Sequence, residues 1–120
     1  MKRDVDLIRR IVLAVRAAEP GKHISCFEDV DRIVFLEHVQ LLLEANLVEG
    51  RVLPGYMGEP ADAVISRLTW SGQDFADSIN DDTIWNKAKN TILKPTVSWT
   101  FSLLSEWLKT EARKHLPGVI

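Results

Sequence analysis

Residues 42–50 (Leu-Leu-Glu-Ala-Asn-Leu-Val-Glu-Gly) constrain the fold of this chain more than any other part of its sequence. Apolar residues recur every three or four positions over residues 31–45, which predicts an amphipathic helix. Asn46 follows this helix, and asparagine is the residue after glycine that best tolerates left-handed backbone angles. We therefore predict that Asn46 ends the helix in a Schellman cap, which packs Leu47 on Leu42.

The rest of the chain divides into a hairpin and further helices. Strands over residues 47–53 and 64–68, separated by a long loop rich in Gly and Pro, are predicted to form an antiparallel hairpin. Apolar residues at helical spacing predict four further helices: residues 4–18 with Asp4 as N-cap, a segment starting at Thr69 or Ser71, a segment from Asp82 to Pro95, and a segment starting at Thr96 or Ser98. The predicted fold class is α+β.

Length and composition bound the class of protein. A chain of 120 residues with 46% apolar residues can bury one core without disulfides or a structural metal. We expect a single domain overall, with a core over residues 1–82 and a helical extension over residues 83–120, packed on that core or on a partner subunit. The single cysteine and apolar runs of only about four residues favour a soluble cytoplasmic protein with no membrane association.

The order helix, helix with a left-handed cap, two-stranded hairpin and helix resembles that of winged-helix modules, in which the hairpin is the wing. The resemblance is carried by L-x-E-A-(G/N)-L-(V/I) at residues 42–48 and by L-T-x-x-G at residues 68–72. One feature departs from this pattern. Residues 18–31 leave room for only about one helical turn, so the middle helix of a helix-turn-helix is expected to be short or missing.

A narrower resemblance covers most of the chain. The sequence resembles a protein family found in bacteria and their prophages, the domain of unknown function 2513. The resemblance lies in residues 2–9, 38–42, 67–75 and 81–85. This resemblance implies a winged-helix-like fold and a prophage or mobile-element context. It implies no chemistry.

The net charge of −2 hides an uneven distribution. Residues 1–50, 51–82 and 83–120 carry formal charges of −2, −4 and +4. The basic C-terminal segment can contact nucleic acid, pair with the acidic residues 74–82, or form a solvated surface. Within residues 31–46, where a winged helix would place its recognition helix, one arginine faces three carboxylates. That is the wrong sign for duplex phosphates.

Two binding functions compete for this sequence. In the first, the chain is a protein-interaction scaffold, whose docking face is the acidic helix with Glu37, His38 and Glu44. In the second, it is a small DNA-binding regulator that contacts DNA through the wing and basic helices. The candidate nucleic-acid residues are Arg32, Gln40, Arg51, Arg67, Lys87 and Lys89. Charge favours the scaffold, whereas the usual role of the fold favours the regulator.

The last predicted helix carries apolar residues on more than one side. A helix that is apolar nearly all round must be covered by another surface, and tryptophan is favoured at interfaces. We therefore hypothesise self-association, as in a homodimer, through Trp99, Leu103 and Trp107.

Enzymatic chemistry has little support in the sequence. His23 and Cys26 are three residues apart, but a zinc site needs three or four ligands, and no second pair at suitable spacing exists. Carboxylates follow Cys26 and would raise its pKa, so we expect a buried structural thiol there. Asp81 and Asp82 are better explained as helix-capping residues than as a catalytic pair. We expect no catalytic residues, metal or cofactor.

Overall fold

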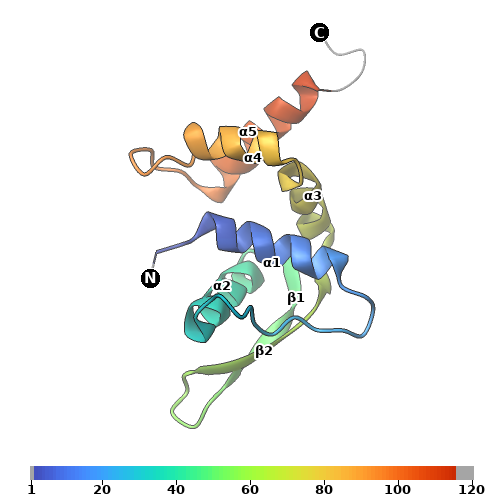
Figure 1. Ribbon diagram of the computed structural model, residues 1–120, viewed down its shortest axis with the longest axis vertical. Coiled ribbons are helices and arrows are strands. Elements are labelled where there is room, and N and C mark those ends of the chain that lie inside the picture. The colour runs from blue at the N-terminus through green and yellow to red at the C-terminus, as the bar shows by residue number, and fades with distance from the viewer. Residues whose placement is uncertain (1, 116–120) are drawn as a thin grey trace. The chain divides into compact units, whose positions relative to one another are not determined.

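The computed structural model describes residues 2–115 and divides into two compact units, residues 1–76 and 77–120. The chain forms an α+β, winged-helix-like fold followed by C-terminal helices, as predicted (Figure 1). Its elements are α1 (Val5–Ala17), α2 (Arg32–Glu44), β1 (Val48–Pro54), β2 (Pro60–Leu68), α3 (Trp70–Ile79), α4 (Asp82–Asn90) and α5 (Phe101–Lys114). Within residues 2–115, no helix is long and apolar enough to cross a membrane.

The first two helices begin at the predicted aspartates. The Asp4 side chain accepts a hydrogen bond from the Leu7 N–H at 3.1 Å, which satisfies one free donor at the start of α1. Asp31 caps α2 in the same way. The two helices and the hairpin bury the first unit's core, which includes Ile11, Val12, Val15, Phe35, Leu36, Val39, Leu42, Leu47, Val48, Ile65 and Leu68.

The left-handed cap of α2 is confirmed. Asn46 has a φ of 58° and is the only described non-glycine residue with a positive φ. The Leu47 N–H donates to the Leu42 carbonyl, and the Asn46 N–H donates to the Leu43 carbonyl, each at 3.0 Å. These two bonds define a Schellman motif, and Leu42 and Leu47 are both buried. The cap turns the chain directly into β1.

The L-T-x-x-G sequence joins α3 to this cap. The Thr69 hydroxyl donates to the Asn46 carbonyl at 2.7 Å and accepts from the Gly72 N–H at 3.0 Å, so Thr69, and not Ser71, caps α3. A Cβ atom at Gly72 would collide with the Leu47 carbonyl oxygen. The motif is therefore explained by close backbone packing.

The hairpin is longer than its sequence predicts. β2 begins at Pro60, which lies opposite Pro54, so the tip comprises only residues 55–59. The predicted long loop was wrong because residues 60–63 pair with β1. A register shift after Glu49 marks a bulge near the base of the hairpin. In Figure 1 the tip extends beyond α1 and α2.

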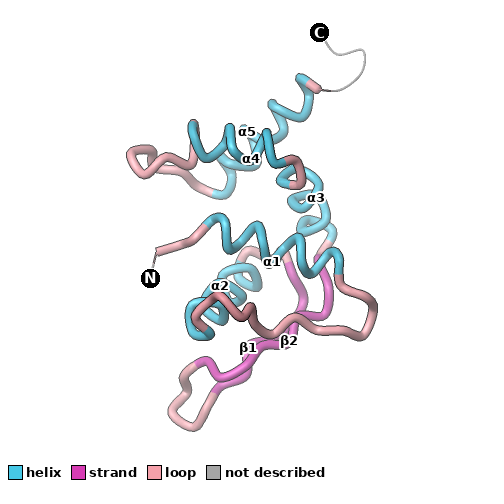
Figure 2. Tube along the Cα trace, viewed as in Figure 1, coloured by secondary structure: helices cyan, strands magenta, loops and turns pink. Residues whose placement is uncertain are grey.

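Residues 18–31 form neither helix nor strand, so the middle helix of a helix-turn-helix is missing (Figure 2). Side chains hold this connection in place. Phe27 meets the buried Phe35 edge to face, with ring centroids 5.2 Å apart, and the Arg10 guanidinium lies 4.1 Å from the Phe27 ring centroid. Arg10 also pairs with Asp29 at 2.8 Å, and its hydrogen bond lowers the pKa of that carboxyl.

Helix α4 of the second unit begins as predicted and ends early. The Asp81 side chain accepts from the Ile84 N–H at 2.9 Å, which confirms Asp81 as a helix cap. The helix ends at Asn90, before the predicted stop at Pro95. The Thr91 hydroxyl donates to the Lys87 carbonyl at 2.7 Å and caps the last turn there.

Helix α5 begins at Phe101, because Thr100 is its N-cap and accepts from the Leu103 N–H at 3.2 Å. The predicted start at Thr96 or Ser98 was therefore wrong. The turn that precedes it is held by the Val97 N–H, which donates to the Lys94 carbonyl. The buried apolar residues of the second unit are Ile79, Trp85, Ala88, Leu104 and Leu108.

Candidate functional site

The outer surface of α2 is both apolar and acidic. Because the helix buries Phe35, Leu36, Val39 and Leu42, its opposite side remains open to solvent. Ile33 is 45% exposed and Val34 is 37% exposed, so the apolar spacing of residues 31–45 does not bury these two side chains. Gln40 and Glu44 are exposed, and Glu37 is half-buried. We call Ile33, Val34, Glu37, Gln40 and Glu44 the α2 face.

His38 does not belong to this face. Its ring is completely buried, which corrects the expectation that it lies on the interaction surface. The ring Nε2 accepts the Asp4 N–H at 2.9 Å, which assigns the ring proton to Nδ1, and Nδ1 donates to the Val34 carbonyl at 2.7 Å. Nδ1 therefore fixes the ring on its own helix, and Nε2 ties the start of α1 to α2. His38 is a structural residue.

The arginine of α2 is used within the fold. The Arg32 guanidinium donates two hydrogen bonds to the Ala61 carbonyl, at 2.9 and 3.2 Å, and lies 3.2 Å from the Asp62 carboxylate. These contacts fix the first turn of α2 against the start of β2. They also leave the α2 face with Glu37 and Glu44 as its charged groups.

The two candidate arginines of the wing differ in their surroundings. The Arg67 guanidinium forms two hydrogen bonds with the Glu49 carboxylate, at 2.8 and 3.0 Å, and a third with the Leu68 carbonyl. Arg51 is exposed on β1 and makes no ion pair within residues 2–115. Of the two, Arg51 alone presents an uncompensated charge.

In the second unit, the candidate Lys87 holds a buried carboxylate. Glu111 is 3% exposed, and it accepts from Lys87 at 2.9 Å and from Lys114 at 3.0 Å. These two hydrogen bonds lower the pKa of Glu111. Lys89, on the same helix as Lys87, is half-buried. Part of the basic charge of the second unit therefore stabilises the packing of α4 against α5.

The predicted self-association residues lie before and on α5. Leu103 is 51% exposed, whereas Trp99 and Trp107 are half-buried. Val97 and Phe101 add further exposed apolar area. The buried side of α5 is formed by Leu104 and Leu108.

The wing tip carries exposed residues that the sequence did not single out. Tyr56 and Met57 are almost completely exposed, at 108% and 91%. They lie between Gly55 and Gly58, and the positive φ of Gly58 closes the turn. The available signal was an aromatic and a methionine inside a Gly- and Pro-rich loop, where such residues have no helix or strand to pack against.

Cys26 and His23 lie on the connection between α1 and α2. Cys26 is exposed, so the expected buried thiol was wrong. His23 places its Nδ1 atom 3.2 Å from the Ile65 carbonyl and helps to hold the connection against β2. In residues 2–115, no group of three or more His, Cys, Asp or Glu side chains is arranged to hold a metal ion.

Residues 2–98 match the sequence family described as "Hypothetical protein (DUF2513)". The chain belongs to this family. A Haemophilus influenzae protein described as "Uncharacterized protein" is 30% identical over 114 residues, which cover 92% of this chain and 94% of that relative. No solved structure matches the chain. The DUF2513 match includes α1 to α4 and ends before α5.

Proposed function

We propose that this DUF2513 protein is a non-enzymatic binding module that docks a protein partner on the α2 face. The observation that carries the proposal is the charge on α2. Its one cation, Arg32, is held by Ala61 and Asp62. Glu37 and Glu44 have no ion-pair partner among residues 2–115 and lie beside exposed Ile33. A partner surface that complements the α2 face is therefore apolar at its centre, to meet the exposed apolar side chains, and basic at its rim, to meet the two carboxylates.

Binding of duplex DNA is the alternative function. Salt-dependent affinity for duplex phosphates comes from available cations, and Arg32 and Arg67 already bind carboxylates of their own chain. Arg51 and Gln40 are the exposed wing and helix candidates that favour this alternative. Lys87 binds Glu111, and the other basic candidate, Lys89, lies in the second unit.

A salt series separates these two functions. The full chain is titrated with random duplex DNA at about 50 mM salt and above, and anisotropy is recorded. The scaffold function predicts no binding at the lowest salt. Measurable affinity whose logarithm falls by several units per unit of log salt would establish phosphate contacts and contradict the proposal. Arg51→Ala would then reduce that slope by about one.

The docking face is tested by charge reversal. The chain is immobilised and exposed to a lysate of its host bacterium, and retained proteins are identified and then purified for binding measurements. Glu37→Lys with Glu44→Lys should abolish the specific complex. The matched control is Glu28→Lys with Asp74→Lys, which makes the same charge change at exposed carboxylates outside the α2 face. Equal loss in both double variants would contradict docking on α2.

The exposed apolar residues of α5 favour a second contact, in which two copies associate through Trp99, Leu103 and Trp107. Leu103→Glu should shift a homodimer to monomer in sedimentation experiments, because an exposed site accepts the charge without loss of folding. A monomeric wild type at tens of micromolar would contradict this contact.

The bacterial, prophage-associated and cytoplasmic setting of the proposal rests on the family resemblance and the single cysteine.

A further inference from the structure

Trp70, the first residue of α3, is a large apolar side chain that the fold leaves in solvent. It is 84% exposed, whereas Phe75 on the same helix is buried. Within residues 2–115 its indole makes no hydrogen bond, ring contact or cation contact. The packing that explains the L-T-x-x-G sequence therefore gives Trp70 no structural role. A tryptophan that packs on nothing in its own chain is typical of an interface anchor.

The backbone that carries Trp70 is held on both sides. The Thr69 N–H donates to the Leu47 carbonyl at 3.0 Å, and the Thr69 hydroxyl donates to the Asn46 carbonyl at 2.7 Å. On the other side, Gly72 packs directly against the Leu47 carbonyl. These contacts fix the start of α3 to the end of α2, so the backbone at Trp70 loses little conformational entropy when the side chain binds a partner.

One turn after Trp70, α3 carries a carboxylate. Residues four apart in a helix are neighbours on one face, with Cβ atoms about 5–6 Å apart, so Asp74 lies beside the indole. Asp74 is exposed and has no ion-pair or hydrogen-bond partner in the described part of the chain. An indole face and a free carboxylate at this spacing fit a guanidinium group, which stacks on the ring and donates to the carboxylate.

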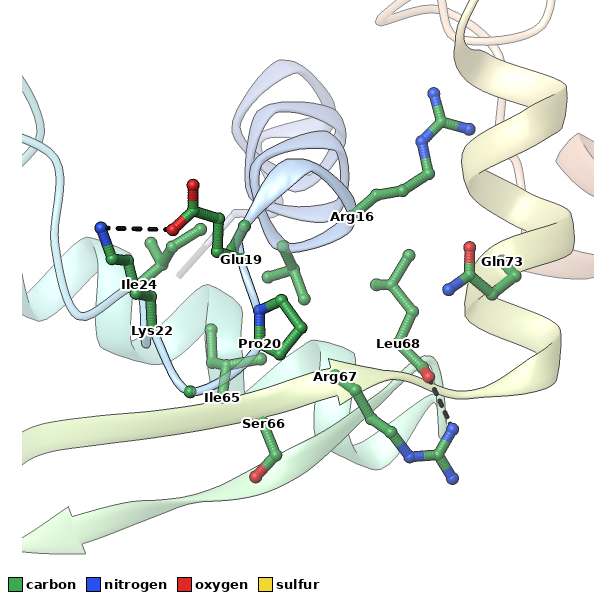
Figure 3. A pocket seen from close by; sticks show the side chains of 13 residues that line it. Arg16, Glu19, Pro20, Lys22, Ile24, Ile65, Ser66, Arg67, Leu68 and Gln73 are labelled. Carbon is green, nitrogen blue, oxygen red and sulfur yellow. Dashed lines mark hydrogen bonds and ion pairs between the residues drawn. The ribbon is translucent and has the colours of Figure 1, made fainter.

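The surrounding charges also favour a cation. Arg67 is the closest basic residue in sequence, but it forms two hydrogen bonds with the Glu49 carboxylate, and this pair adds no net charge. Figure 3, which looks into the cavity beside β2, shows the Arg67 guanidinium also bonded to the Leu68 carbonyl. The positive end of α3 is offset by the negative end of α2, to which it is bonded. Glu44, in the last turn of α2, is exposed and unpaired within residues 2–115 and adds negative charge.

We propose that Trp70 and Asp74 bind an arginine side chain of a protein partner, with its guanidinium stacked on the indole and hydrogen-bonded to the Asp74 carboxylate. Lysine fits less well, because an ammonium group has neither the planar stacking surface nor the forked donors of a guanidinium. Neither Trp70 nor Asp74 belongs to the α2 face, so this site is independent of the function proposed above.

The test uses a phage-displayed library of random peptides, selected on the immobilised full chain. Peptides that bind the wild type and not Trp70→Ala should share an arginine. One such peptide is then synthesised together with its citrulline counterpart, which keeps the shape of the side chain and lacks the charge. Citrulline removes both the stacked cation and the ion pair and should raise the Kd about tenfold, whereas Asp74→Asn removes the ion pair alone and should raise it about threefold.

Matched controls make the same changes elsewhere. Tyr56→Ala removes another almost fully exposed aromatic side chain, and Glu28→Gln neutralises another exposed carboxylate. Both controls should bind the peptide like the wild type. In NMR spectra the bound peptide should also shift the indole N–H resonance of Trp70, which is identified by its loss in Trp70→Phe. The indole resonance of the buried Trp85 should stay unchanged.

Several results would overturn the proposal. One is a selection that yields no arginine peptide whose binding depends on Trp70. Another is enrichment of acidic peptides, which would show that the positive end of α3 outweighs the carboxylates. Equal affinity for the arginine and citrulline peptides, or an equal loss of affinity in the control variants, would also refute the site. None of these results bears on docking at the α2 face, which is tested with a different partner and different variants.

Discussion

Replacing Asn46 tests whether the left-handed cap aims the wing. The backbone at this residue is held from both sides, because its N–H binds Leu43 and its carbonyl accepts from Thr69. The chain therefore cannot relax to a right-handed conformation without breaking these bonds. Alanine at a left-handed position costs about 1–2 kcal/mol. Glycine adopts it freely, but its larger freedom in the unfolded chain costs about 0.4–1 kcal/mol.

The expected result is that Asn46→Gly is more stable than Asn46→Ala by about 1 kcal/mol. In urea denaturation this difference moves the midpoint without changing the slope. The control is Gln40, an exposed position within α2. There the order must reverse, because glycine inside a helix is less stable than alanine by about 0.8–1.0 kcal/mol. An alanine variant at Asn46 that equals or exceeds the glycine variant would refute the cap.

Two further predictions concern the buried polar residues. His38→Phe keeps the ring volume but leaves the Asp4 N–H without its acceptor, so we expect a loss of about 1–3 kcal/mol in denaturant unfolding; an unchanged midpoint would contradict the assigned role. Because the pKa of Glu111 is lower in the folded chain than in the unfolded chain, the stability contributed by Lys87 and Lys114 is present near pH 7. It is lost as the pH falls below the ordinary glutamate pKa of 4.5 and through the lowered value. Thermal unfolding of wild type and Glu111→Gln should therefore differ at pH 7 and converge at low pH, and a difference independent of pH would contradict this.

Local chemistry explains which parts of the fold could be predicted from sequence. The caps at Asp4, Asp31 and Asp81 depend on a side chain and N–H groups two or three residues away, and Asn46 depends on its own backbone angle. Such contacts can be predicted from sequence without knowledge of the tertiary structure. The end of α4 was missed although Thr91 also acts locally, because Pro95 is the stronger stop signal in the sequence.

The misplaced residues depend on distant partners. His38 is buried because its acceptor nitrogen meets the backbone of Asp4, 34 residues earlier. Lys87 stays exposed, but its ammonium group is bound by the buried carboxylate of Glu111, 24 residues later. A charged or polar residue on a helix looks exposed in sequence until such a partner is known. The one available signal for His38 was its spacing, three residues after Phe35 and four before Leu42 on the buried side of α2.

The same long-range pairing bears on the choice between the two functions that the sequence leaves open. By count, Arg32 and Arg67 are as available to DNA as Arg51, and the charge of α2 is only moderately negative. In the fold, Arg32 fixes α2 to β2 and Arg67 joins the two strands through Glu49. Arg32 holds the hairpin near its tip and Arg67 holds it at its base, so a DNA contact through these arginines would compete with the bonds that position the wing. Their structural use therefore leaves the α2 face acidic, which favours a protein partner over a phosphate backbone.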